Sequence, residues 1–323
     1  MTNILITGGA GYLGTTIVDV LMRSSKEVGT SLPYLFFSKI TVYDNLMHRQ
    51  TPFLNYCSDT RFNFVRGDVR NEEKLAEVVK EADIIIPLAA IVGFPACESD
   101  RKSAYDINVG HIKTILKHKK PKAKVVYPNT NSGYGVGDAD EHCTEETPLN
   151  PISYYGVTKC EAEDLVLKSD GISLRLATVF GLSPRMRMDL LVNDFVYKAY
   201  KDKYLVLFEQ NFRRNYIHVK DVACAFIKAI REYPYMKGQA YNVGLSSANL
   251  TKLQLAEKIK EYTNLSINID EIAVDPDKRD YLVSNAKLEA LGWKPQFSLE
   301  DGIKELLKGY VILDSHLHPY CNL

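Results

Sequence analysis

The feature that most constrains the fold of this chain is a glycine-rich turn near its amino terminus. A short apolar run at residues 3–6 leads into residues 7–14, which read TGGAGYLG in one-letter code. This order predicts a buried strand, a tight turn and a helix, in which Gly8 permits the turn, Gly11 lets main chain approach a phosphate and Gly14 allows close packing. The helix amino terminus is then a site for a diphosphate. We expect this stretch, namely Gly8, Gly11, Tyr12, Leu13 and Gly14, to bind a dinucleotide cofactor.

Strand and helix patterns alternate over the first part of the chain, which predicts an α/β fold with a doubly wound parallel sheet of the Rossmann type. Further strands are expected near residues 39–43, 62–66, 84–86, 125–127, 172–176 and 240–244. The remainder predicts a smaller, discontinuous, C-terminal substrate-binding domain. We place the cofactor domain at residues 1–177 plus about 215–245, and the substrate domain at about 178–214 plus 246–323.

The second predicted strand is followed by Asp44 and Asn45. A carboxylate at this point can accept hydrogen bonds from ribose hydroxyls and would repel a 2′-phosphate, so NAD is favoured over its phosphorylated form. Asp44 follows the glycine-rich turn at a longer spacing than the roughly 20 residues that are usual. We attribute the extra length to a surface insertion around residues 24–38.

The third predicted strand is followed by Gly67, Asp68 and Val69. We expect Asp68 to meet the adenine amino group and Val69 to pack on the adenine ring. The alternative is that Asp68 caps a helix over residues 71–80. Both roles are compatible, and we favour the adenine contact.

Residues 153–159 (SYYGVTK) place a tyrosine and a lysine four residues apart. If the stretch is helical, Tyr155 and Lys159 share one face of the helix. A free phenol has a pKa near 10, and a neighbouring ammonium lowers that pKa and makes the phenol a usable base. With the hydroxyl of Thr130 opposite, the three side chains can take a proton from an alcohol while a nicotinamide takes the hydride. The spacing alone also fits a surface helix, but the glycine-rich turn argues for the catalytic interpretation.

The composition fits a soluble enzyme. The chain has 323 residues, with 40 Lys and Arg balanced by 40 Asp and Glu, so nothing favours nucleic acid, and the basic run at residues 117–122 is expected to be a solvated loop. No membrane-spanning stretch or signal peptide is evident, so we expect a cytoplasmic protein. Six cysteines without Cys-x-x-Cys spacing predict reduced thiols. The His- and Cys-containing tail, residues 314–321, is expected to be a flexible terminus, and we predict no metal.

Together these residues resemble the extended short-chain dehydrogenase/reductases that modify nucleotide sugars, such as UDP-galactose 4-epimerase and the dTDP-glucose and GDP-mannose 4,6-dehydratases. The resemblance covers nearly the whole chain. The matching pieces are residues 8–14, Asp44, residues 67–69 and 88–90, Asn108 with His111, residues 130–135, Tyr155 with Lys159, and residues 214–219 and 279–281.

The resemblance implies that Tyr155 is the general base, that Lys159 binds the nicotinamide ribose and lowers the pKa of Tyr155, and that Thr130 orients the reacting hydroxyl. It implies tightly bound NAD and a nucleotide-diphosphate sugar, whose diphosphate Arg214 and Arg279 would grip. The other implied contacts are Leu88, Ala89, Ala90 and Asn108 for the cofactor, and Asn131, Ser132, Thr178 and Asn193 for the substrate. An ordinary polar helix position is nearly as good an interpretation of Asn193.

One departure from the family pattern bears on the reaction. The dehydratases carry Thr-Asp-Glu where this chain has Thr130, Asn131 and Ser132, and neither an amide nor a serine readily supplies the acid and base that eliminate water. Dehydration is therefore disfavoured. Oxidation at C4 followed by 4-epimerisation, or by release of the 4-keto sugar, both stay open, and so does a non-catalytic NAD-binding sensor.

Three stretches, residues 87–100, 128–135 and 183–189, resemble a branch of bacterial surface-polysaccharide enzymes, some of which oxidise GDP-manno-heptose at C4. The roles of Arg185 and Arg187 in the last stretch stay open between phosphate binding, sugar contact and simple solvation. The family analogy also suggests a homodimer or higher homo-oligomer through paired helices. The apolar positions Val109, Ile112, Ile115 and Leu116 fit such a contact and the monomer core equally well.

Overall fold

The fold is described from a computed structural model, in which residues 2–24, 35–48, 52–137, 141–272 and 278–313 are described. Within these residues seven strands form one parallel sheet in the order β11-β7-β5-β4-β1-β2-β3. The order reverses between β1 and β4, as in a doubly wound sheet, so the predicted fold class is confirmed. The strands are β1 (Asn3–Thr7), β2 (Lys39–Asp44), β3 (Phe62–Arg66), β4 (Ile84–Pro87), β5 (Lys124–Thr130), β7 (Ile172–Leu176) and β11 (Ala240–Val243).

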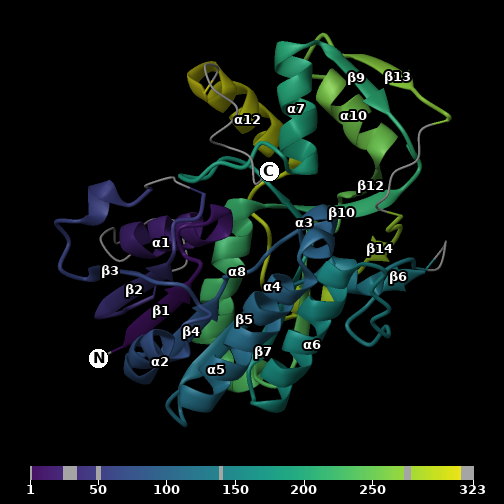
Figure 1. Ribbon diagram of the computed structural model, residues 1–323. Helices are drawn as coiled ribbons and strands as arrows, with labels where there is room; N and C mark the ends of the chain where they lie inside the picture. The colour runs from purple at the N-terminus through teal and green to yellow at the C-terminus, as the bar shows by residue number, and fades with distance from the viewer. Residues whose placement is uncertain (1, 25–34, 49–51, 138–140, 273–277, 314–323) are drawn as a thin grey trace.

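Helices cover both faces of this sheet (Figure 1). On one face, α1 (Tyr12–Ser24) and α8 (Val219–Arg231) bury an apolar core that includes Ile17, Leu21 and Phe226. On the other face, α2 (Glu72–Glu81), α5 (His111–His118) and α6 (Tyr154–Lys168) bury a second core. Strands covered on both faces need apolar side chains in both directions, which explains the uninterrupted isoleucines of β4.

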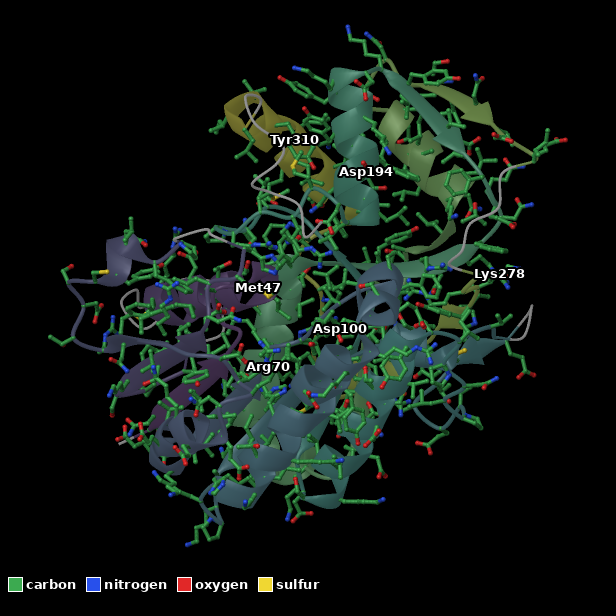
Figure 2. The ribbon with its side chains drawn as sticks, in the orientation of Figure 1. Met47, Arg70, Asp100, Asp194, Lys278 and Tyr310 are labelled. Atoms are coloured by element: carbon green, nitrogen blue, oxygen red, sulfur yellow. The ribbon has the colours of Figure 1, made fainter. Side chains whose placement is uncertain are left out.

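A second body, which we call the upper lobe, lies above the sheet in Figure 1. It consists of α7 (Leu191–Lys201), β9 (Tyr204–Leu207), α10 (Lys252–Lys260), β13 (Ser266–Ile269) and α12 (Leu299–Leu313). Its own core includes Val196, Leu255 and Leu306. Figure 2 shows Tyr310 of α12 and Asp194 of α7 on neighbouring helices, and the Tyr310 hydroxyl donates to the Asn193 carbonyl at 2.7 Å.

Short strands connect the two bodies. In one small sheet β10 (Arg213–His218) lies between β8 (Thr178–Phe180) and β12 (Asn249–Thr251), and β14 (Leu282–Val283) pairs with β6 (His142–Cys143). The helix α11 (Ala286–Ala290) returns to the large sheet, where Leu288 and Trp293 join the core beside α1 and α8. The predicted substrate domain, residues 246–323, thus includes residues that pack on the cofactor-domain sheet.

The remaining elements are short. They are α3 (Phe94–Ser99), α4 (Arg101–Tyr105), a π-helical turn η2 (Asp106–Gly110), α9 (Tyr233–Met236) and the single 3-10 turns η1 (Leu54–Tyr56) and η3 (Asn131–Tyr134). The π-helical turn precedes α5 and contains Asn108. Such turns are rare in helices and are frequent at functional sites.

Several local expectations are settled by the structure. The alternative that Asp68 caps α2 is wrong, because Asn71 is the cap and accepts from the Lys74 amide at 3.0 Å. Asp68 instead pairs with Arg70 at 2.7 Å. The basic run is only partly the predicted loop: Lys117 and His118 end α5 and lie against Glu72, and Lys120 beyond the helix pairs with Asp83. The side chains of Val109, Ile112 and Ile115 are fully buried in the monomer.

Other expectations concern features that the described residues only partly cover. Among these residues no helix is both long and apolar enough to cross a membrane, and no cluster of three His, Cys, Asp or Glu side chains could hold a metal ion. The five described cysteines are free thiols, at positions 57, 97, 143, 160 and 224. Most of the expected insertion, residues 25–34, and the tail with Cys321 lie outside the described residues.

Candidate active site

A cavity of about 390 Å³ opens at the carboxyl edge of the large sheet, beneath the upper lobe. Its walls come from the segments that follow β1, β2, β3, β4, β5 and β7, together with residues of α6, of the segment between β8 and α7, and of the segment before β14. This is where doubly wound sheets bind their ligands, because the strand order reverses there and leaves a crevice. Met47, labelled beside α1 in Figure 2, is one of the lining residues.

The glycine-rich turn forms one wall, and Gly8 and Gly14 cannot be replaced without collision. A Cβ on Gly8 would lie 2.5 Å from the main chain of Ala89, and Gly8 has a φ of +66°. A Cβ on Gly14 would lie 2.5 Å from the Cα of Gly9. The turn is therefore packed as closely as main chain allows, and the helix amino terminus behind it faces the cavity with Gly11, Tyr12 and Leu13.

Asp44 is fixed at the end of β2 by the turn itself. Its Oδ2 accepts from the Ala10 amide at 3.0 Å and its Oδ1 accepts from the Leu46 amide at 2.8 Å. Burial raises the pKa of the Asp44 carboxyl, and the two amides and the charge of Arg185 lower it. Each carboxylate oxygen keeps a lone pair for a further donor, so Asp44 can accept a ribose hydroxyl.

The segment after β4 is held by Asn108. The Asn108 side chain accepts from the Ile91 amide at 2.9 Å, donates to the Ile91 carbonyl at 3.1 Å, and donates to the Thr158 hydroxyl at 3.0 Å. Asn108 is not among the residues that line the cavity, whereas Leu88, Ala89, Ala90 and Ile91 are. The hydrogen bonds of Asn108 therefore join the segment after β4 to the helix α6.

Thr130, Tyr155 and Lys159 all line the cavity. Thr130 ends β5, and the other two lie one turn apart on α6, which begins with a Ser153 side chain that accepts from the Gly156 amide. The Lys159 side chain is buried, with its Nζ 4.1 Å from the centre of the Tyr127 ring. The structure thus brings together the three side chains that the sequence singles out for proton transfer.

Burial dominates the electrostatics of this trio. It raises the pKa of Tyr155 to about 12, while Arg279 and, more weakly, Arg187 lower it. It lowers the pKa of Lys159 to about 7. In the protein without cofactor, therefore, the cations that most favour the Tyr155 phenolate are Arg279 and Arg187, which lie far from α6 in the sequence, rather than the lysine on the same helix.

The two arginines expected to grip a diphosphate lie differently. Arg279 lines the cavity, and its Nη1 donates to the hydroxyl of Ser132. Arg214 is buried and is not a lining residue; its Nη1 donates to the carbonyls of Arg213 and Arg279, and its guanidinium stacks over Tyr281. In the structure Arg214 supports the segment that carries Arg279.

The other expected substrate residues also divide into lining and supporting positions. Ser132 and Thr178 line the cavity, and Ser132 Oγ accepts from Thr130 Oγ1 at 2.9 Å. Asn131 is buried outside the lining set. Asn193 is fully buried; it accepts from the Gly181 amide at 3.0 Å and donates to the Arg187 carbonyl at 2.7 Å. The expected cofactor residues Asn45, Asp68 and Val69 line the cavity.

Sequence reasoning missed part of the wall. Met47 and His48 follow Asp44 and Asn45, and residues 91–93 follow Ala90; all of them line the cavity. Their position just beyond the carboxyl end of a parallel strand was a usable signal, because all such ends meet at one edge. The sequence left the role of Arg185 open for another reason. A loop arginine usually faces solvent, but Arg185 is only 1% exposed.

Comparison with known proteins identifies the family. Residues 4–244 match the model of the NAD dependent epimerase/dehydratase family. The chain belongs to this family. The expectation of an NAD-dependent enzyme related to nucleotide-sugar epimerases and dehydratases is thereby confirmed, and the match begins at β1 and ends after β11, so it spans the whole large sheet.

Curated relatives of this family align along most of the chain. The low-salt glycan biosynthesis protein Agl12 of Haloferax volcanii is 28% identical over 319 residues, which are 96% of this chain and 98% of that protein. The UDP-glucuronic acid decarboxylase 1 of Arabidopsis thaliana is 28% identical over 325 residues, covering 95% of this chain and 69% of that protein.

Solved structures of family members superpose on both bodies. The dTDP-glucose 4,6-dehydratase of Bacillus anthracis, solved in complex with NAD, has a TM-score of 0.80 at 26% identity and covers 97% of each chain. The UDP-glucuronic acid 4-epimerase of Bacillus cereus has a TM-score of 0.83 at 22% identity, and covers 97% of this chain and 100% of that one. At 22% identity, the likeness to the 4-epimerase shows a shared fold only.

The residues present fit NAD. Gly8 and Gly11 line the cavity without side chains, so amide groups at the start of α1 can approach a diphosphate. Asp44 lies at the end of the next strand, where its carboxylate suits a ribose with free hydroxyls. Tyr155 and Lys159 line the same cavity and are the residues that would lie near the nicotinamide ribose.

Proposed function

We propose that this protein oxidises the C4 hydroxyl of a nucleotide-diphosphate sugar, a hexose or a heptose, in bacterial surface-polysaccharide synthesis. The observation that carries the proposal is the presence of Thr130, Tyr155 and Lys159 in one cavity wall, facing the same space as the glycine-rich turn and Asp44. The names of the relatives support the substrate class, since they include a glycan biosynthesis protein and enzymes of UDP-linked sugars.

The chemistry follows from the side chains. Tyr155, as the phenolate, takes the proton of the C4 hydroxyl at its Oη, and the Thr130 hydroxyl holds the same oxygen in place. When bound, NAD supplies the acceptor for the hydride that leaves C4. The charges of Arg279 and Arg187 stabilise the phenolate before the transfer, and the charge of Lys159, one turn along α6, would add to them when that lysine is protonated. The product is a ketone at C4, because the alcohol has lost the proton from its oxygen and the hydride from C4.

Two outcomes follow from this ketone. If it is reduced on its other face before it leaves, the net reaction is 4-epimerisation. If it is released, the enzyme is a 4-dehydrogenase. Dehydration is the less favoured outcome, because the family's acid and base positions hold Asn131 and Ser132, and Ser132 is already bonded to Thr130 and Arg279.

The decisive experiment is incubation of the purified protein with UDP-, GDP-, CDP- and dTDP-linked hexoses and heptoses. Reduced nicotinamide is followed by absorbance and the sugar product by NMR. A C4-inverted sugar indicates an epimerase, and a 4-keto sugar formed in amounts equal to the enzyme indicates a dehydrogenase that must be reoxidised.

Tyr155→Phe should keep NAD bound and lose about 10²- to 10⁴-fold in the rate of oxidation. Full turnover by this variant would favour a different base, and binding without any turnover by the wild type would favour a sensor.

The same proposal includes the residues that contact the sugar nucleotide, the location of the protein in the cell and its oligomeric state. We place the sugar nucleotide between the sheet edge and the upper lobe, with residues 178–214 and 246–323 contributing most of its contacts, in a cytoplasmic homodimer or higher homo-oligomer. Since Val109, Ile112 and Ile115 are committed to the monomer core, pairing of α5 and α6 between subunits would use outward side chains such as Val157, which is 43% exposed. Light scattering of the purified protein tests the assembly.

A further inference from the structure

The segment between β8 and α7 is tied to the first turn of α1 by a set of hydrogen bonds (Figure 1). The Tyr12 hydroxyl donates to the Gly181 carbonyl at 2.7 Å. The Ser183 hydroxyl donates to the Tyr12 carbonyl at 2.7 Å and lies 2.8 Å from the Thr15 hydroxyl. The Arg185 amide donates to the Thr15 hydroxyl at 3.3 Å. We call residues 181–189 the crossing segment, because here the chain passes from the large sheet to the upper lobe.

These bonds place Arg185 between two parts of the cofactor wall. Its amide is held by the first turn of α1, and its side chain lines the cavity that Asp44 and His48 also line. The Arg185 charge reaches both: it lowers the pKa of the Asp44 carboxyl, and it adds to the burial that lowers the pKa of His48 to about 4. A buried guanidinium in a cavity wall is little screened by water, and it offers a planar fork of donors to an anion bound there.

The neighbouring cation, Arg187, has a counter-charge within the crossing segment. Arg187 also lines the cavity, but its guanidinium pairs with Asp189 through two hydrogen bonds, of 3.2 Å and 2.5 Å. Its charge is therefore largely balanced within the crossing segment. Arg185 is the cation of this segment that lies on the side of Thr15 and Asp44.

We propose that Arg185 binds the diphosphate of the NAD cofactor, so that the cofactor is held by the crossing segment as well as by the glycine-rich turn. The amides of the turn donate to the diphosphate from the helix amino terminus. The guanidinium of Arg185 adds a charge-assisted, two-pronged donor from a part of the chain more than a hundred residues away. This arrangement closes the cofactor between two separate segments and favours its retention between turnovers.

The test compares two fragments of the cofactor, ADP-ribose and adenosine, each measured by its ability to displace NAD so that only the cofactor site is reported. In Arg185→Gln, ADP-ribose affinity should fall about tenfold to a hundredfold, the magnitude of one charge-assisted hydrogen bond. Adenosine has no phosphate, so its affinity should stay within about twofold of the wild type. Binding of these fragments needs no sugar, so failure here leaves the proposed reaction untouched.

Arg61→Gln is the matched control, since Arg61 pairs with Asp59 away from the cavity and its loss changes the net charge equally. This control should bind both fragments like the wild type. If Arg185→Gln does not fold, Arg185→Lys replaces it, because lysine lacks the planar fork and should still lose ADP-ribose affinity selectively. Equal losses for both fragments, or unchanged ADP-ribose affinity, would overturn the assignment.

Discussion

Arg175 of β7 and Glu163 of α6 form a buried ion pair, with Nη2 2.7 Å from Oε1 and both side chains less than a tenth exposed. Glu163 lies one turn after Lys159 on α6, and its Oε2 also accepts from Asn129 at 2.6 Å and Ser173 at 2.5 Å. The pair thus joins α6 to β5 next to Thr130 and to β7. The helix and strand that carry the proposed base and hydroxyl are held by one carboxylate.

Removing one partner of this pair should destabilise the protein strongly. Glu163→Gln leaves the Arg175 guanidinium buried without its counter-charge, and we expect a loss of about 3–5 kcal/mol in the free energy of unfolding. Urea unfolding of the cofactor-free protein measures it. The double variant Glu163→Gln with Arg175→Met should lose less than the sum of the two single changes, and strict additivity would show that the pair is not coupled.

The third glycine of the turn should tolerate no side chain. Gly14→Ala places a Cβ 2.5 Å from the Gly9 main chain, so the turn must shift and NAD affinity should fall by at least about tenfold, the effect of 1.4 kcal/mol. Isothermal titration with NAD measures the loss. Gly110→Ala is the matched control, because its Cβ would lie 3.9 Å from the Tyr105 carbonyl oxygen, an ordinary contact distance. Equal NAD affinity in the two variants would contradict the close packing of the turn.

Lys159 should give the cofactor-free protein a characteristic pH dependence. Burial lowers its pKa from 10.5 to about 7, so between these pH values the unfolded chain binds a proton that the folded protein has released. Stability should therefore rise with pH from about 7 to about 10.5. Urea midpoints of wild type and Lys159→Met across this range isolate the contribution, because every other group is shared. Parallel curves for the two proteins would mean that Lys159 stays protonated.

Arg279 should set the pH at which oxidation begins. It is the strongest of the charges that lower the pKa of Tyr155, so its removal raises that pKa and reduces the phenolate fraction at neutral pH. In Arg279→Gln the rising limb of the pH–rate profile should move to higher pH. Arg279→Lys keeps the charge and should move it much less. If both variants only raise KM, with an unshifted profile, Arg279 acts by holding the substrate alone.

Most of the large sheet could be predicted because its strands are apolar runs bounded by turns. The third strand occupies the expected residues, and the fifth continues from the expected Tyr127 to Thr130 because its pairing with β7 continues to Leu176. The glycine-rich turn and the Tyr155–Lys159 spacing were visible for a similar reason. In each case the residues that act together lie within a few positions of one another in the sequence.

What could not be predicted depends on contacts between distant segments. Arg214 and Asn193 have side chains suited to a phosphate or a sugar, yet their bonds go to main-chain carbonyls and amides of neighbouring segments. Arg185 presents the opposite case, since it is a loop residue that is buried where its loop is hydrogen-bonded to Tyr12 and Thr15. Residue type alone does not separate these outcomes.

The bonded crossing segment also has a consequence for the divergence of such enzymes. An inserted or deleted residue between Gly181 and Arg185 would break several hydrogen bonds to α1 at once. It would therefore disturb the glycine-rich turn as well as the path of the chain into the upper lobe. On the upper lobe, Tyr204 and Val206 of β9 are 44% and 43% exposed, and substitutions at such positions are usually tolerated. For the proposed sugar substrate, changes of preference are therefore expected to arise by side-chain replacement, with the length of the crossing segment held constant.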